Sequence, residues 1–275
     1  MSLWWKWIVI LEKIIAHKQK EVAERREFVP VKKLEQSEHF KAPCVSLVRY
    51  LNRSDKVGVI AEIKRRSPSK GAINEYISVE KVSIGYMQAG ASALSILTDA
   101  EFFGGSNEDL ITARKFNYCP ILRKDFTIDE YQIVEARSIG ADAILLIAAA
   151  LDEKQIKNLS AFAASLGLEV LLEIHEFEEL PGDLENVSII GVNNRNLKDF
   201  SVDVNRSFTI AEKLPAGIVK ISESGLSEPE TIIKLKRAGF KGFLIGETFM
   251  RESQPELACG EFIKKVQSSM FKVQS

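Results

Sequence analysis

The chain has 275 residues, of which 45% are hydrophobic and 27% charged, an ordinary composition for a globular protein with a large core. Its formal net charge of -1 excludes an overall positive field that would attract nucleic acid or an anionic membrane, so any anion site must be built locally. The length permits one or two domains, but α/β barrels of roughly 200–250 residues fold as a single unit.

The start of the chain predicts a helix. Residues 1–11 form an apolar run that resembles the core of a signal peptide, but Glu12 and Lys13 interrupt it and no small-residue cleavage site follows. No apolar run in the sequence reaches the roughly 18 residues that a transmembrane helix needs. Residues 10–26 have apolar side chains at spacings of three and four, which favours an amphipathic helix after a short irregular start, native or vector-derived.

A second polar stretch, residues 42–51, also predicts a helix, separated from the first by Pro30. No strand pattern occurs in this part of the chain. Residues 10–55 are therefore predicted to be a helical extension that packs outside the main fold, near the C-terminal mouth of the barrel proposed below.

After Lys56, short β-rich apolar runs alternate with amphipathic helical patterns. The candidate strands are residues 57–63, 93–98, 120–123, 143–148, 169–174, 188–192, 218–222 and 242–245. The helical patterns between them include residues 79–89, 130–139, 153–166, 204–213 and 229–238. Eight strands each followed by a helix predict parallel strands with right-handed crossovers, which close into a TIM barrel.

The fold class predicted is therefore α/β, an eight-stranded parallel βα (TIM) barrel with an N-terminal helical extension. The barrel should occupy residues 57–268 within one domain, residues 1–275. The competing fold is an open doubly wound sheet, whose dinucleotide-binding form would need a G-x-G-x-x-G motif after the first strand. The sequence has no such motif.

Polar side chains gather at the predicted C-terminal strand ends, where TIM barrels place their active sites. They include Glu62, Lys64, Lys124, Glu173, Asn193, Arg195 and Glu223. Any one of them could be only a solvated loop residue. Because they follow several strands at once, the pattern predicts one pocket that holds lysines, an arginine and carboxylates.

A phosphate site is predicted after the last two strands. Ser224 and Gly225 follow the seventh strand, and Gly246 and Glu247 follow the eighth, where exposed backbone N–H groups commonly bind phosphate in barrels. The alternative is a pair of tight turns that only require glycine. The basic loop of residues 64–71 could close over the anion, and its lack of aromatic residues argues against nucleic acid as the ligand.

Cysteines and histidines give no sign of a metal site. Cys44, Cys119 and Cys259 lie far apart without a C-x-x-C pair, which argues against a disulfide framework or zinc knuckle and favours a cytoplasmic location. The three histidines are dispersed, and His175 is expected to be a loop or helix-start residue.

Several motifs together resemble the indole-3-glycerol-phosphate synthase family. They are EIKRRSPSKG at 62–71, LTD at 97–99, FFGGS at 102–106, LRKDF at 122–126, LLEIH at 171–175, IGVNNR at 190–195, SESG at 222–225 and LIGE at 244–247. The resemblance extends from Ile10 to about Val266. The chain departs from it where Pro181 and Gly182 break the helix after the fifth strand, and where Glu247 replaces a frequent serine.

The resemblance implies ring closure, decarboxylation and dehydration of 1-(2-carboxyphenylamino)-1-deoxyribulose 5-phosphate, a step of tryptophan biosynthesis. Lys124 would be the general acid, Glu173 the base, and Lys64 a second proton donor near the substrate carboxylate. Glu62 and Asn193 would complete the catalytic group: Glu62, with Glu223, would orient the lysines and the ribulose hydroxyls, and Asn193, with Arg195, would hold polar substrate groups. Ser67 would belong to the mobile first loop. The remaining implied site residues are Phe103, Phe126 and Leu145 for the anthranilate ring, and Ser224, Gly225, Gly246 and Glu247 for phosphate. No cofactor is needed, and other enzymes of the pathway are possible partners.

Two other functions remain open from the sequence. A sugar-phosphate isomerase or epimerase on a TIM barrel would explain the phosphate site and the Lys/Glu pair, but not the helical extension or the apolar wall. A non-catalytic barrel scaffold would predict that Lys124 and Glu173 lie far apart or point outward.

Overall fold

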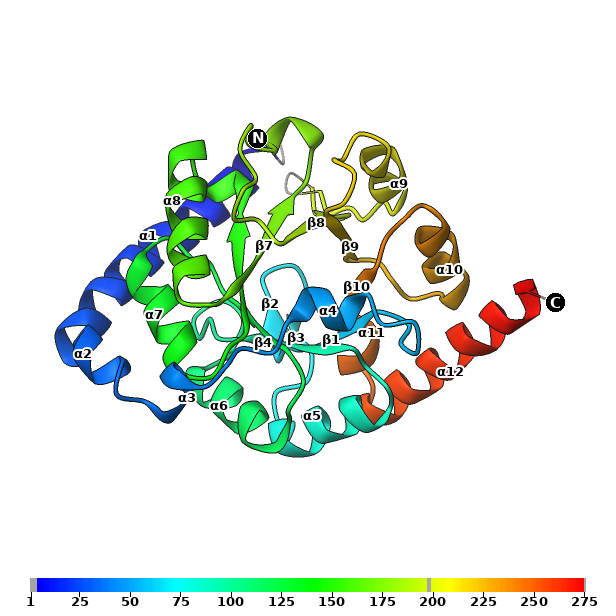
Figure 1. The fold of residues 1–275 in the computed structure, drawn as a ribbon, viewed down its shortest axis with the longest axis horizontal. Coiled ribbons are helices and arrows are strands. Elements are labelled where there is room, and N and C mark those ends of the chain that lie inside the picture. Colours follow the sequence, from blue (N-terminus) through cyan, green and yellow to red (C-terminus); the bar gives the residue numbers. More distant parts are fainter. Residues whose placement is uncertain (1–3, 197–198, 275) are drawn as a thin grey trace.

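The computed structural model describes residues 4–196 and 199–274, and eight parallel strands within them form a closed barrel (Figure 1). Around the barrel the strand order is β1-β10-β9-β8-β7-β6-β5-β4. The strands are β1 (Val59–Ile63), β4 (Ala93–Leu97), β5 (Ile121–Lys124), β6 (Ala143–Ile147), β7 (Glu169–Ile174), β8 (Ile189–Asn193), β9 (Val219–Glu223) and β10 (Gly242–Ile245). The prediction of a TIM barrel is confirmed.

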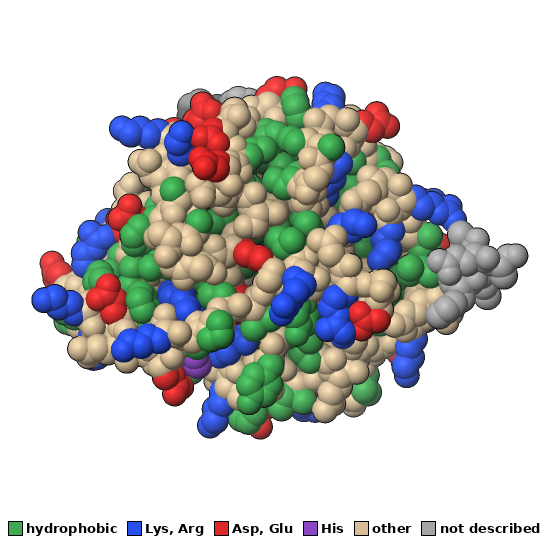
Figure 2. Space-filling view, viewed as in Figure 1, with side chains coloured by type: hydrophobic (Ala, Val, Ile, Leu, Met, Phe, Trp, Pro, Cys, Tyr) green, Lys and Arg blue, Asp and Glu red, His purple; other side chains and the backbone are tan. Residues whose placement is uncertain are grey.

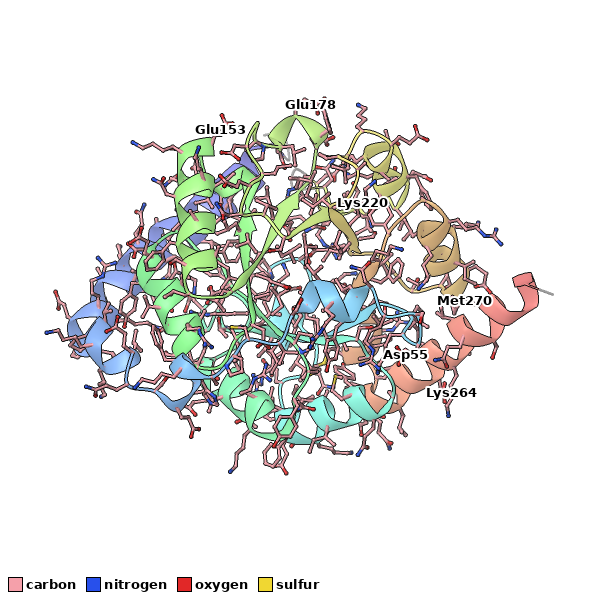
Figure 3. All side chains as sticks on the ribbon, viewed as in Figure 1. Asp55, Glu153, Glu178, Lys220, Lys264 and Met270 are labelled. Carbon is pink, nitrogen blue, oxygen red and sulfur yellow. The ribbon has the colours of Figure 1, made fainter. Side chains whose placement is uncertain are left out.

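Alternation along each strand divides the side chains between two hydrophobic clusters. In β1, Ala61 and Ile63 pack outward against the helices, whereas Ile60 belongs to the cluster inside the barrel. Since strand side chains alternate with a period of two, Glu62 shares the inward face with Ile60. The same rule turns Lys124 inward beside Leu122. Five strands, β1, β5, β7, β8 and β9, bring polar side chains to the mouth, namely Glu62, Lys124, Glu173, Asn193 and Glu223, whereas the inward side chains of β6 and β10 are apolar there. Side chains fill the enclosed space (Figure 3).

Helices follow every strand except β7. They are α5 (Val79–Gln88), α6 (Asn107–Phe116), α7 (Glu130–Ser138), α8 (Glu153–Ser165), α9 (Asn205–Ala211), α10 (Pro229–Arg237), and α11 (Glu247–Met250) with α12 (Pro255–Gln274). After β7 the chain forms a single 3₁₀ turn, η2 (Phe177–Glu179), in agreement with the helix break expected at Pro181 and Gly182. A second turn, η1 (Ala148–Ala150), precedes α8. The expectation of a helix after every strand is thus wrong at this one position.

The basic loop after β1 is partly ordered by a small antiparallel hairpin. Its strands are β2 (Arg66–Ser67) and β3 (Gly71–Ala72). The side chain of Arg66 donates to the backbone carbonyls of Ala100 and Glu101, which anchors the hairpin to the loop that follows β4.

The N-terminal extension contains four helices. The first, α1 (Trp4–Phe28), begins six residues before the predicted residue 10, and residues 1–3 of the predicted irregular start lie outside the described residues. It is followed by α2 (Val31–Leu34) and α3 (Glu38–Lys41), which pack on α7, and by α4 (Leu47–Leu51). The predicted helix over residues 42–51 is wrong in its first half, because the chain is extended from Ala42 until Ser46 caps α4.

The placement of the whole extension at the C-terminal mouth is also wrong. Leu47 and Leu51 of α4 belong to the cluster inside the barrel, together with Ala93 and Ile189 at the N-terminal ends of their strands. Glu169, the first residue of β7, accepts hydrogen bonds from Ser46 Oγ at 2.5 Å and from the Val48 amide at 2.9 Å. Figure 1 shows α4 crossing in front of the strands, at the centre of the ring of helices. A helix whose apolar face fits the open end of a barrel buries more apolar surface there than on the outside of the barrel. The sequence pattern shows that α4 has an apolar face, but it does not show at which end of the barrel this face is buried.

The surface has no field of a single charge sign on the face that carries α4. Figure 2 shows basic and acidic side chains intermixed there. No described helix is long and apolar enough to cross a membrane. Cys44, Cys119 and Cys259 are all free thiols, as their spacing suggested.

Candidate active site

One cavity opens at the C-terminal ends of the strands, and every site residue predicted from the sequence lines it. These residues are Glu62, Lys64, Ser67, Phe103, Lys124, Phe126, Leu145, Glu173, Asn193, Arg195, Glu223, Ser224, Gly225, Gly246 and Glu247. They come from all the strands of the barrel or from the loops that follow them. The extension contributes the apolar side chains of Ile10, Leu11 and Ile14 from α1. The first helix therefore lies at this mouth, as expected, although the rest of the extension does not.

A cluster of lysines and carboxylates occupies the floor of the cavity. Lys124 Nζ lies 3.1 Å from Glu173 Oε2 and 3.7 Å from Glu223 Oε2. Lys64 Nζ donates to Glu62 Oε1 at 2.7 Å, and Ser95 donates to the other Glu62 oxygen. All three carboxylates are buried, so the lysines partly compensate the cost of burying these negative charges.

The surroundings shift the pKa values of three of these groups in different directions. Burial alone would lower the pKa of Lys124, but Glu173, Glu223 and Glu62 outweigh it and raise the pKa above its ordinary value. Burial would raise the pKa of Glu173, but Lys124, His175 and a hydrogen bond from Asn193 lower it to about 2. Burial and the neighbouring Glu173 carboxylate raise the pKa of Glu223 to about 8, against the effect of Lys124. The surroundings thus favour the charged forms of Lys124 and Glu173 and the protonated form of Glu223.

Two glycines make room for these carboxylates. A Cβ atom at Gly191 would lie 2.2 Å from Glu223 Oε1, and one at Gly246 would lie 2.5 Å from Glu62 Oε1. Neither distance is possible between real atoms, so both positions require glycine as long as the carboxylates keep their places.

Apolar side chains form one wall of the cavity. The rings of Phe103 and Phe126 are tilted against each other with centroids 6.0 Å apart, and Leu145 lies among the buried residues inside the barrel. Together with Ile10 and Ile14 of α1 they form an apolar surface next to the charged floor, suited to a planar aromatic group.

The predicted phosphate corner combines unusual backbone with charged side chains. Ser224 and Gly225 both have positive φ angles, 68° and 75°, which turn the chain sharply after β9. Gly246 is the N-cap of α11, whose first N–H groups have no partner inside the helix. The Glu247 carboxylate lies 3.4 Å from Lys70 Nζ and 3.5 Å from Arg195 Nη2, so two cations already converge on this corner.

Three further residues at this mouth were not identified as site residues from the sequence. They are Lys70, described above, His175, which is buried and lines the cavity, and Lys18 of α1. A spacing of two residues from Glu173 could have indicated that His175 shares its inward face. Lys18 gave no such signal, because a lysine in an amphipathic helix is usually solvated.

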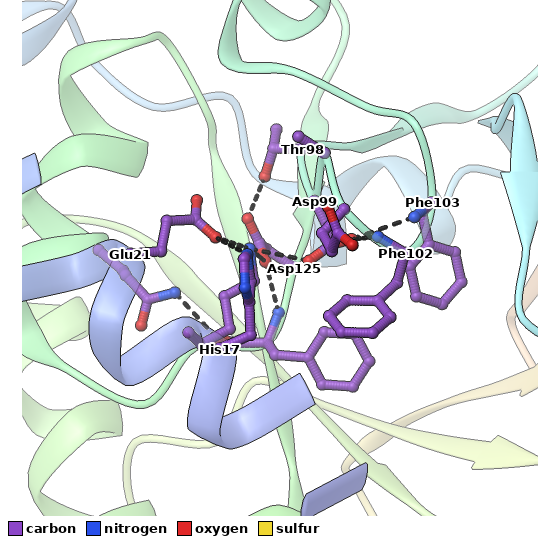
Figure 4. A network of polar contacts seen from close by, with 12 residues as sticks. His17, Glu21, Thr98, Asp99, Phe102, Phe103 and Asp125 are labelled. Carbon is purple, nitrogen blue, oxygen red and sulfur yellow. Dashed lines mark hydrogen bonds and ion pairs between the residues drawn. The ribbon is translucent and has the colours of Figure 1, made fainter. Parts of the chain in front are cut away.

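Lys18 is only 1% exposed and contacts three carboxylates, from Glu21 at 2.8 Å, Asp125 at 2.9 Å and Asp99 at 3.0 Å. Figure 4 shows Glu21 on α1 and the two aspartates on the barrel pointing toward one centre. Asp125 follows Lys124 directly, and Asp99 accepts hydrogen bonds from the amides of the loop that holds Phe103. This cluster therefore attaches α1 to the segments that carry the lysine and the aromatic wall.

The neighbours of Lys124 in sequence point away from the cavity floor, as strand alternation predicts. Arg123 contacts Glu135 of α7 at 2.5 Å, and Asp125 contacts Lys18. Lys124 and Glu173, by contrast, face each other inside the barrel, which is not the arrangement expected of a non-catalytic scaffold. Among residues 4–196 and 199–274, no three His, Cys, Asp or Glu side chains are grouped so that they could hold a metal ion.

Comparisons with known proteins agree on one family. Residues 11–262 match the family model described as indole-3-glycerol phosphate synthase. An indole-3-glycerol phosphate synthase of Bacteroides thetaiotaomicron is 50% identical over 258 residues, which cover 94% of this chain and 99% of that protein. A protein of the same name from Laribacter hongkongensis is 42% identical over 90% of this chain and 97% of its own length.

Among solved structures, a thiamine phosphate pyrophosphorylase from Pyrococcus furiosus has a similar fold. The TM-score is 0.56 at 15% sequence identity, and the match covers 78% of this chain and 97% of that one. An identity this low supports the shared barrel fold alone.

Proposed function

The chain belongs to the indole-3-glycerol phosphate synthase family, and we propose that its cavity converts 1-(2-carboxyphenylamino)-1-deoxyribulose 5-phosphate into indole-3-glycerol phosphate, CO₂ and water. The observation that carries the proposal is the position of Lys124. Its ammonium lies in a buried carboxylate cluster, between an apolar wall at one side and a cationic corner at the other. An acid, an aromatic site and a phosphate site in one cavity are what this reaction requires.

Substrate binding follows from the three parts of the cavity. The phosphate would lie at the corner of Ser224, Gly225 and Gly246, bound by backbone N–H groups and by the side chain of Arg195. Glu247 would contribute its amide rather than its carboxylate. The anthranilate ring would pack on three side chains of the apolar wall, Phe103, Phe126 and Leu145. Its carboxylate would then point toward Lys64.

Ring closure needs an acid at the ketone oxygen. As the aromatic carbon bonded to the carboxylate attacks the ketone carbon, the electron pair of the C=O π bond moves to oxygen, which takes a proton from Lys124. The C–C bond to the carboxylate then breaks, CO₂ leaves, and its electron pair restores the aromatic ring. Since the neighbouring carboxylates keep Lys124 charged at neutral pH, the proton is available when the substrate binds.

Dehydration needs both an acid and a base. The hydroxyl leaves as water with a proton from a lysine, and Glu173 accepts the proton of the neighbouring methylene carbon. The ionised state of Glu173, stabilised by Lys124 and Asn193, suits this role. Lys64 is the second donor of the proposal, oriented by Glu62 at 2.7 Å. Glu223 and Ser67 would bind the ribulose hydroxyls.

We further propose that residues 57–268, the barrel, and residues 10–55, the extension, form one domain. The burial of Leu47 and Leu51 inside the barrel supports this. The three free cysteines favour a reducing compartment such as the cytoplasm.

The test is direct, because the product contains an indole ring and the substrate does not. The purified protein is incubated with the anilino-deoxyribulose phosphate while indole fluorescence is recorded. We expect the fluorescence to rise with enzyme concentration. A panel of sugar phosphates serves as the control, and isomerisation of one of them without indole formation would contradict the proposal.

A further inference from the structure

His175 lies inside the cavity next to Glu173, and the proposed reaction has so far given it no role. It follows β7 directly and is only 3% exposed. Its ring contacts two carboxylates, with Nε2 3.5 Å from Glu173 Oε1 and Nδ1 3.6 Å from Glu179 Oε2. Neither ring nitrogen makes a well-aligned hydrogen bond with any described atom, so both remain available for proton transfer.

The position of His175 is fixed through its backbone. Its amide donates to Glu179 Oε2 at 2.7 Å, and its carbonyl accepts from Arg206 Nη1 of α9, also at 2.7 Å. Arg206 in turn is paired with Glu176. The charged groups around the imidazole are thus Glu173 with Lys124 on the cavity side, and Glu179, Glu176 and Arg206 on the outer side. Two carboxylates on opposite sides of a histidine suit an imidazole that gains and loses protons.

The outer end of this row reaches solvent. Glu179 belongs to η2, the short turn that stands where a barrel helix would otherwise cover β7, and its side chain is 25% exposed. Figure 3 shows its neighbour Glu178 at the outer edge of the molecule. A continuous row of Glu179, His175, Glu173 and Lys124 therefore connects the surface to the cavity floor, with gaps of 3.6, 3.5 and 3.1 Å.

The proposed reaction needs such a connection, and the inference rests on that proposal. Two protons leave the enzyme per turnover, one to the ketone oxygen and one to the departing hydroxyl, whereas Glu173 receives only one from the methylene carbon. The difference arises because an anionic carboxylate leaves as neutral CO₂. One proton must therefore enter from solvent in each cycle, to a lysine whose side chain is only 15% exposed and lies among buried carboxylates.

We propose that His175 is a positioning and relay residue that transfers this proton from Glu179 at the surface to the Glu173–Lys124 pair. Nδ1 receives a proton on the side of Glu179, and the imidazolium releases its Nε2 proton to Glu173, which passes it to the neutral Lys124 amine. No oxidant, reductant or further reactant takes part. The distances to His175 exceed an ideal hydrogen bond, as is common for catalytic contacts before substrate binds.

The test compares His175→Gln with the wild type at saturating substrate. The glutamine is of similar size and polar but does not titrate, so the relay predicts a fall in kcat of about tenfold or more, on the scale of lost acid–base function. KM should change little, because His175 contacts no part of the phosphate corner or the apolar wall. In His175→Gly, which leaves space for the lost ring, added imidazole buffer should restore part of the turnover. Glu179→Gln, at a partly exposed position, should lower kcat in the same direction but less.

His39→Gln on α3, far from the cavity, is the matched control and should keep wild-type turnover. The relay is wrong if His175→Gln or Glu179→Gln leaves kcat within about twofold of the wild type, well below the expected loss. It is also wrong if His175→Gln lowers kcat and the melting temperature together while imidazole fails to restore turnover to His175→Gly, since a structural role predicts that pattern. A wild-type enzyme that forms no indole would instead overturn the proposed function itself, and the relay with it.

Discussion

At the N-terminal end of the barrel, Leu47 and Leu51 of α4 are buried among aliphatic side chains, whereas at the C-terminal end α1 brings Lys18 to a cluster of carboxylates. Both helices belong to the same extension, and each packs at one mouth of the same barrel. The first mouth is closed by hydrophobic packing, which stabilises the fold. The second contains buried charges, which cost free energy unless each has a partner. The N-terminal mouth therefore affects stability alone, whereas the C-terminal mouth combines the proposed chemistry with charge clusters that must stay paired.

The largest effect should follow from removing the proposed acid. Lys124→Met should reduce turnover by about 100-fold or more, the usual scale for a general acid. The variant should still fold, but with lower stability, because Glu173 and Glu223 lose their nearest cation. Lys124→Arg should not restore activity, since a guanidinium keeps its proton. Indole fluorescence measures the turnover of both variants, and circular dichroism shows whether Lys124→Met is folded.

Phosphate affinity provides the control for that variant. Because Lys124 is not part of the phosphate corner, product binding measured by calorimetry should remain close to the wild-type value. Turnover within about threefold of the wild type in a folded Lys124→Met protein would show that the catalytic role assigned to Lys124 is wrong.

The ion cluster on α1 should contribute strongly to stability. Lys18→Met leaves three carboxylates without their central cation, and breaking a buried ion pair in this way costs about 3–5 kcal/mol. Urea unfolding measures the loss, and turnover should fall as well, because Asp125 adjoins Lys124. Lys20→Met, at an exposed position on the same helix, should change stability by less than about 0.5 kcal/mol. Equal stability of the two variants would contradict the importance of this cluster.

The opposite mouth should respond in stability alone. Leu47 is fully buried, so Leu47→Ala should cost about 2–5 kcal/mol, the range for truncating a core leucine. The KM of the remaining folded enzyme should be unchanged, since the cavity lies at the other end. Leu257→Ala, on a side chain that is 58% exposed, is the control. A large change in KM for Leu47→Ala would show that the two mouths are coupled.

Glu223 should make stability depend on pH. Its pKa is raised from 4.5 to about 8, so between these values the folded protein holds a proton that the unfolded chain releases. The free energy of unfolding should therefore fall as pH rises from 5.5 to 7.5, by at most about 1.4 kcal/mol per pH unit. Glu173, with its pKa lowered to about 2, is ionised in both states over this range and adds no slope.

Glu223→Gln should remove this slope, whereas Glu178→Gln at the surface should keep it. Urea unfolding at three pH values distinguishes the two variants. A slope that persists unchanged in Glu223→Gln would mean that groups other than Glu223 cause it.

The smallest effect is expected at the phosphate corner. The Glu247 carboxylate competes with the substrate phosphate for Lys70 and Arg195, so Glu247→Gln should lower KM, by about two- to fivefold on the scale of a half-exposed ion pair. The dependence of KM on salt concentration should increase at the same time. A higher KM would show instead that the carboxylate helps to bind the substrate.

The barrel and its floor could be predicted from the sequence because both follow from short-range rules. Strands covered on both faces are continuously apolar, and alternation then decides which residue at each strand end points inward, as for Glu62 and Lys124. The residues of the phosphate corner followed from glycines after the last two strands.

The features that could not be predicted depend on contacts between distant parts of the chain. The apolar face of α4 indicates that it is buried, but only the folded chain shows that the N-terminal mouth is the place. Lys18 appeared to be a solvated helix lysine, because its partners Asp99 and Asp125 are about 100 residues away. His175 is a loop residue, as expected, but only the folded chain shows that its side chain lies in the cavity beside Glu173.

Helix α7 illustrates how far the extension is integrated with the barrel. Eight of its nine residues are buried, including charged ones, because α1, α2 and α3 cover the side that would face solvent in a bare barrel. Glu135 pairs with Arg25, and the Tyr131 hydroxyl donates to carbonyls at the end of α1. A protein engineer who trimmed this chain to a minimal barrel would expose this helix and leave Glu135 without Arg25 and Tyr131 without its acceptors on the extension. That sector would have to be redesigned in the shortened protein.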